Sequence, residues 1–68
     1  MAYTLHIETL DGTVEPTFTE PFFSKRLAIE TARLAAAGTN PGTARIIVQD
    51  AAEMSVAAFP CAAPILTT

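Results

Sequence analysis

One segment constrains the fold of this chain more than any other, the run Ser24-Lys-Arg-Leu-Ala-Ile-Glu-Thr-Ala-Arg-Leu-Ala-Ala-Ala-Gly38. Serine is a good helix N-cap, and glycine is common just past a helix end. The apolar residues between them recur at helical spacing, so the segment predicts a single helix. Its expected apolar face is centred on alanines with larger residues on the flanks: Ala28, Ala32 and Ala35, then Ile29, Ala36, Leu27 and Leu34. A helix with such small side chains must lie close against a sheet.

Strand-like segments stand on both sides of this helix. Tyr3–Thr9 alternates apolar and polar residues, and Thr13–Thr19 alternates again after Asp11-Gly12, a strong signal for a two-residue hairpin turn. Ala44–Asp50 is the most β-prone stretch, and Met54–Phe59 is a weaker fourth strand. Pro16 cannot donate to a strand ladder, so the second strand belongs at a sheet edge.

The order strand, strand, helix, strand, strand predicts an α+β fold with one helix packed on a four-stranded antiparallel sheet. The expected spatial order is second, first, third, fourth, joined by a right-handed crossover. Residues 1–60 form the expected single ββαββ domain, and residues 61–68 an apolar tail interrupted by proline. The expected core consists of inward-facing residues: Leu5, Ile7, Val14, Phe18, Leu27, Ala28, Ala32, Ile46, Val48 and Val56.

Composition argues against several function classes. The 68 residues include one cysteine and one histidine, which exclude an intrachain disulfide and do not fill a structural zinc site. The net charge of −3 provides no basic stripe for nucleic acid. No targeting or membrane-spanning segment is visible, so we expect a cytoplasmic protein. A core this small favours stabilisation by association, and a homodimer is expected.

The candidate chemical residues do not form a catalytic pattern. His6 has no nucleophile or orienting partner near it in sequence, and its strand position predicts a surface histidine. Cys61 lacks the cationic neighbours that activate a thiolate, so we expect a passive, partly buried thiol. We therefore expect no enzyme activity, no cofactor and no metal.

The outer face of the sheet is the first candidate interface. In the expected register Ile47, Ala57 and Phe59 point away from the helix, next to the apolar tail residues Ile65 and Leu66. An exposed apolar patch of this kind marks an interface in many soluble proteins. Two interpretations stay open: a partner or a second copy covers the patch, or the tail folds back over it.

Acidic residues in the first third of the chain are the second candidate, with Glu8 and Glu15 expected on the polar strand face: Glu8, Asp11, Glu15 and Glu20. One interpretation is a solvated face that keeps the edge strand from pairing. The other is a docking patch for a basic partner.

The segments Tyr3-Thr-Leu-His-Ile, Phe23-Ser-Lys-Arg-Leu-Ala-Ile-Glu-Thr-Ala-Arg and Ala44-Arg-Ile-Ile-Val carry a resemblance. Their arrangement resembles small hairpin–helix–hairpin domains of bacteria and phages, including some anti-CRISPR proteins. The resemblance implies an inhibitor that occupies a surface of a host nuclease or a crRNA-guided complex, and it assigns no site residue. The alternative is a structural or assembly module that acts through copies of itself or a cognate host protein.

Overall fold

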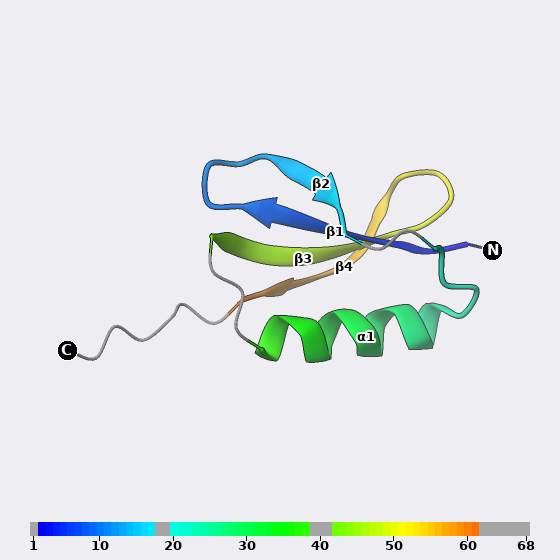
Figure 1. The fold of residues 1–68 in the computed structure, drawn as a ribbon. Helices are drawn as coiled ribbons and strands as arrows, with labels where there is room; N and C mark the ends of the chain where they lie inside the picture. The colour runs from blue at the N-terminus through cyan, green and yellow to red at the C-terminus, as the bar shows by residue number, and fades with distance from the viewer. Residues whose placement is uncertain (1, 18–19, 39–41, 62–68) are drawn as a thin grey trace.

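The computed structural model describes residues 2–17, 20–38 and 42–61. Its elements are β1 (Thr4–Thr9), β2 (Val14–Pro16), α1 (Lys25–Ala37), β3 (Thr43–Gln49) and β4 (Ser55–Pro60). The strands form one antiparallel sheet in the order β2-β1-β3-β4, and α1 lies along one face of it (Figure 1). The predicted fold and strand order are confirmed.

The start of α1 is fixed by its cap and by a short bridge to the sheet. The Ser24 hydroxyl accepts a hydrogen bond from the Leu27 backbone N–H at 3.2 Å, as expected of an N-cap. Just before it, Phe22 and Tyr3 exchange two backbone hydrogen bonds of 2.7 Å. Phe22 packs against the core, whereas Phe23 is 78% exposed. The chain is thereby tied to the sheet immediately before the helix begins.

The core lies between α1 and the central strands. Its buried members are three alanines of the helix and three larger residues of β1 and β3: Ala28, Ala32, Ala36, Leu5, Ile46 and Val48. Full burial of a large aliphatic side chain stabilises the fold by roughly 1.5–3 kcal/mol. The alanines allow the helix backbone to approach the sheet closely. Ile7 and Val56 pack against this cluster, and Phe18 is outside the described residues.

The buried face of α1 differs from the expected one. Its centre is Ala32 between Ala28 and Ala36, and Leu27 and Leu34 are exposed. At about 100° per residue, these leucines lie about 140° and about 160° around the helix from Ala32, on the same side. The prediction that Leu27 belongs to the core is therefore wrong. The alanine row, which fits closest to the sheet, determines the rotation of the helix.

The first hairpin has a longer turn than predicted. Thr9 pairs with Thr13 and the loop contains three residues, ending at Gly12 with a φ of 93°. A shift of one residue exchanges the two faces of a strand. Val14 therefore lies opposite Glu8 on the outer face and is exposed, so its predicted place in the core is wrong.

The second hairpin closes in the same way, with Asp50 paired to Met54 and Glu53 at a φ of 61°. The register between β3 and β4 then shifts between Val48 and Gln49, which leaves Val56 as an extra residue in β4. Such a β-bulge changes which residues share a face.

Candidate functional site

Ile47 lies in the middle of the outer sheet face. Ile47 faces away from the helix, directly opposite His6 of β1 and Ala58 of β4. Its predicted orientation is confirmed, but only 8% of Ile47 is exposed. His6 is half-buried, and its Nε2 lies 2.9 Å from the Thr4 hydroxyl oxygen. This face therefore presents little of the apolar area expected from Ile47.

The predicted outward orientation of Ala57 and Phe59 is wrong. Ala57 lies opposite Val48 and Phe59 lies opposite Ile46, and both pairs pack on the helix side of the sheet. The cause is the bulge at Val56, which shifts the rest of β4 by one position. The remaining two members of the predicted patch, Ile65 and Leu66, are outside the described residues.

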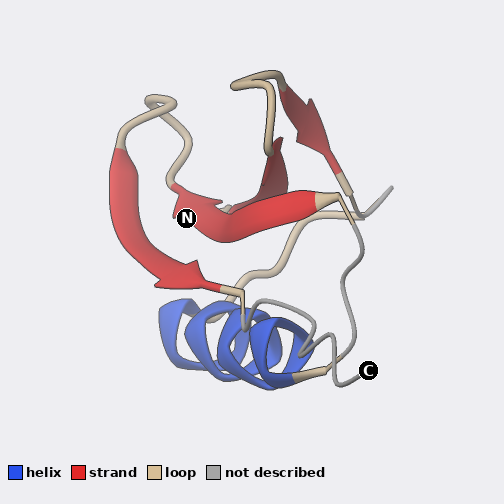
Figure 2. Cartoon of the chain, turned by 90° about the vertical axis from the view of Figure 1, so that its left-hand side faces the viewer, coloured by secondary structure: helices blue, strands red, loops and turns tan. Residues whose placement is uncertain are grey.

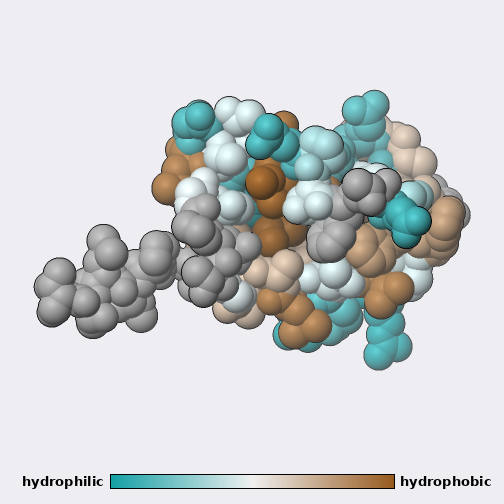
Figure 3. Space-filling view, in the orientation of Figure 1, coloured by the Kyte–Doolittle hydropathy of each residue, from teal (hydrophilic) through white to brown (hydrophobic). Residues whose placement is uncertain are grey.

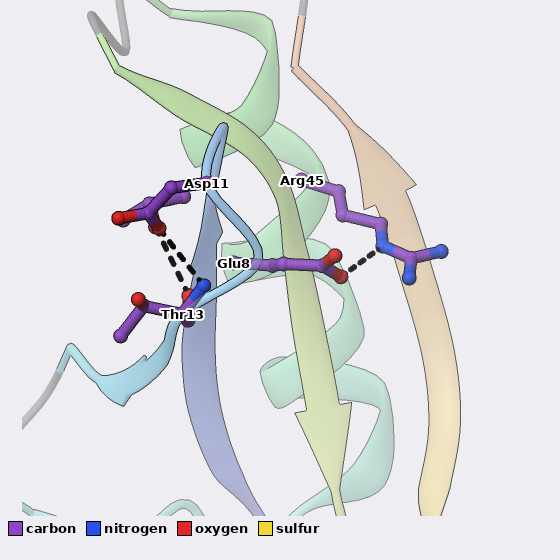
Figure 4. Close-up of polar contacts among 5 residues, drawn as sticks. Glu8, Asp11, Thr13 and Arg45 are labelled. Carbon is purple, nitrogen blue, oxygen red and sulfur yellow. Dashed lines mark hydrogen bonds and ion pairs between the residues drawn. The ribbon is translucent and has the colours of Figure 1, made fainter.

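Two of the four candidate acidic residues are engaged within the fold. The Arg45 Nε donates to the Glu8 Oε1 at 2.6 Å across the outer face, as Figure 4 shows. The Asp11 carboxylate accepts from the Thr9 hydroxyl and from the Thr13 backbone N–H. These bonds, led by that from Thr9, lower the pKa of Asp11 to about 2.

The other two acidic residues lie elsewhere. Glu15 is opposite Ile7, which places it on the helix side of the sheet, whereas Glu8 is on the outer side. Glu20 is exposed in the segment that leads to α1. The expected common face of Glu8 and Glu15 is therefore wrong, again because of the three-residue turn.

Cys61 follows β4 directly and donates its backbone N–H to the Ala44 carbonyl at 2.9 Å. Burial raises the pKa of its thiol, which favours the protonated, weakly nucleophilic form. Within residues 2–17, 20–38 and 42–61, no three His, Cys, Asp or Glu side chains gather in a way that suits a metal ion.

Three large and exposed apolar side chains lie close together in sequence. Two belong to α1, and one belongs to the residue before its N-cap. Phe23 is 78% exposed, Leu27 55% and Leu34 64%. Leu27 and Leu34 are seven residues apart, two helical turns, on the side opposite the buried alanines. Figure 3 shows apolar residues among hydrophilic ones along the lower edge of the molecule, over α1. We call Phe23, Leu27 and Leu34 the outer row.

The outer row was not expected from the sequence, because both leucines were predicted to flank the buried face. The available signal was the spacing of the alanines: a face centred on Ala32 with Ala28 and Ala36 leaves Leu27 and Leu34 on the far side.

The helix that carries Leu27 and Leu34 of the outer row is rich in basic residues. The segment of α1 contains three of the four basic residues, Lys25, Arg26 and Arg33, and one of the seven acidic residues, Glu30. Arg33 donates to Glu30 at 2.6 Å, with both side chains about half exposed. The helix is therefore net positive in a chain whose net charge is −3.

A groove lies between the end of α1 and the end of β4. Its volume is about 340 Å³ and its lining is mostly apolar, with Arg33 as the charged member: Arg33, Ala36, Ala37, Phe59, Pro60 and Cys61. Phe59 reaches this groove because the bulge turns it to the helix side.

Comparison of this chain with protein-family models, curated proteins and solved structures finds no match. Among the described residues, no helix has the length and apolar character needed to cross a membrane.

Proposed function

We propose that this protein is a non-catalytic binding module that contacts a partner protein through the outer row of α1. The observation that supports this most strongly is the exposure of Leu27 and Leu34 on a regular, capped helix. An amphipathic helix with apolar anchors seven residues apart fits a hydrophobic groove on another protein.

Charge adds a preference to this contact. At helical spacing Arg26 and Arg33 lie along one side of the row, so the fitting surface is apolar with an acidic rim on that side. Complementary charge mainly accelerates encounter and selects the partner, whereas the covered leucines supply affinity. Each fully covered leucine contributes roughly 1.5–3 kcal/mol.

The test is partner capture with a double variant, Leu27→Gln and Leu34→Gln, which keeps helix-forming residues at both positions. The matched control is Leu10→Gln, since Leu10 is 76% exposed in the β1–β2 turn. We expect wild type and control to bind the same protein equally, and the double variant to bind at least about 100-fold more weakly. Equal binding by the double variant would reject the outer row.

A narrower form of the proposal is a phage or mobile-element inhibitor of the anti-CRISPR type, acting in the cytoplasm on a nuclease or crRNA-guided complex. Its support is the resemblance of the hairpin–helix–hairpin arrangement, the small size and the net charge of −3. The test is target-DNA cleavage by purified crRNA-guided complexes with added protein. Inhibition by wild type and Leu10→Gln, but not by the double variant, supports it. Unimpaired cleavage by all complexes tested rejects this narrower form only.

The second candidate is a structural module that acts through copies of itself. The open edge of β4 favours it, because Ser55–Pro60 contains no charged residue.

A further inference from the structure

The two edges of the sheet differ in how they are protected. β2 has only three residues and includes Glu15 and Pro16, which discourage pairing with another strand. β4 is twice as long and uncharged. The Cys61 N–H points to β3, so strand alternation directs the N–H and C=O of Ala58 away from the sheet. Pro60 and the bulge at Val56 limit pairing at this edge, but no strand among residues 2–17, 20–38 and 42–61 pairs with its middle.

A groove and a positively charged side chain lie at one end of β4. The groove of about 340 Å³ lies beside Phe59 and Cys61, with Arg33 at its side. The Arg33 side chain is 56% exposed, and its contact with Glu30 uses one of its nitrogen atoms. A guanidinium has five N–H donors, so Arg33 has capacity for a second carboxylate.

The other end of β4 protrudes and carries a negative charge. Met54 is 65% exposed, and Glu53 before it is exposed as well. Glu53 has a φ of 61°, at the turn position that Gly12 fills in the first hairpin. A non-glycine residue in this conformation carries backbone strain. Glu53 therefore occupies a turn position that a glycine would adopt with less backbone strain.

We propose that two copies of this chain associate through their β4 edges, antiparallel and about a two-fold axis. An antiparallel pair of edges brings the Glu53–Met54 end of each copy to the Arg33–Cys61 end of the other. Met54 then enters the apolar groove of the second copy, and Glu53 faces Arg33 there. Both contacts form twice, because a two-fold interface uses the same patch on both subunits. The proposal gives a surface to the second candidate function and is independent of the outer row.

The test is sedimentation equilibrium of the full chain with two charge reversals, Arg33→Glu and Glu53→Arg. We expect wild type to dimerise, and each single variant to dimerise at least about tenfold more weakly, because both contacts become repulsive. An equimolar mixture of the two single variants restores dimers, since each contact then joins opposite charges. The double variant restores them as well. The matched controls, Arg26→Glu and Glu20→Arg, make the same changes in net charge and leave dimerisation unchanged.

A wild type that stays monomeric into the millimolar range overturns the proposal. Occupation of the groove by residues 62–68 would give that result. Dimers that resist both reversals, or a mixture that stays monomeric, overturn it too. Restoration by mixing also shows that both variants are folded. None of these outcomes bears on partner capture through Leu27 and Leu34, which is measured separately.

Discussion

The β1–β2 and β3–β4 hairpins close with the same backbone turn and then diverge. In both, the strand residues before and after a three-residue loop pair directly, and the last loop residue has a positive φ: Gly12 in one, Glu53 in the other. β3 and β4 lie against α1, whereas β2 curls away from the helix (Figure 2). Residues of β2 are exposed throughout.

The two hairpins therefore contribute differently to the core and to the exposed surface. The second hairpin supplies Ile46 and Val48 to the core and leaves an uncharged edge beside α1. The first hairpin supplies Leu5 through β1, while its own edge is protected by Glu15 and Pro16 of β2 and its loop is closed by the bonds of Asp11. We therefore propose that association uses α1 and β4, and not the first hairpin.

The same truncation in each hairpin gives the largest expected contrast. Val48 is fully buried in β3, so Val48→Ala should lower the free energy of unfolding by about 2–3 kcal/mol through lost burial and a residual cavity. Val14→Ala, at an exposed position of β2, should change it by about 0.5 kcal/mol or less. Urea unfolding of both variants measures the difference. Equal losses would show that β2 is part of the core.

A second contrast concerns the face of α1 that meets the second hairpin. Ala32 is fully buried, so Ala32→Leu should overpack the contact and destabilise the fold by about 1–3 kcal/mol. Leu27→Ala should change stability by about 0.5 kcal/mol or less, because Leu27 is exposed. Thermal unfolding of both variants tests the rotation of the helix, and the reverse ranking would contradict it.

Exchanging the turn residues tests the equivalence of the two loops. Glu53→Gly should stabilise the fold by about 0.5–1 kcal/mol, since relief of backbone strain exceeds the added entropy of the unfolded chain. Gly12→Ala should destabilise it by about 1 kcal/mol. A Cβ at Gly12 meets no atom within 4 Å, so this loss is conformational and not steric. Chemical unfolding measures both changes. The protein concentration is kept low, so that association does not contribute to the measured stability.

The smallest effect is the pH dependence of the first turn. The pKa of Asp11 falls from 3.8 to about 2, chiefly through the Thr9 hydroxyl bond and then the Thr13 N–H. A carboxylate with a lowered folded-state pKa stabilises the fold above its unfolded pKa, and that contribution disappears as the pH falls through the folded value. Asp11→Asn should therefore melt below wild type at neutral pH and converge with it toward about pH 2. A constant gap across that range would contradict this role.

The fold was predictable because its pattern is redundant. A capped alanine-faced helix between alternating segments leaves few arrangements, and Pro16 assigns β2 to an edge. Leu5, Ala28, Ala32, Ile46 and Val48 entered the core as predicted.

The predictions that were wrong depend on shifts of one residue in strand register. Asp11-Gly12 fits a two-residue or a three-residue turn, and only pairing across the strands decides the face of Val14. Alanines around Val56 give no alternation signal, so the bulge that turns Phe59 inward was invisible. The rotation of α1 depends on how closely it packs, which sequence periodicity does not specify.

Backbone amide chemical shifts across a dilution series test the central claim most directly. From millimolar to low micromolar protein, the account predicts shifts at Glu53–Phe59, at Cys61 and around Arg33, with Leu10–Val14 unchanged. Shifts centred on the first hairpin, or a spectrum that is unaltered at every position, would contradict it.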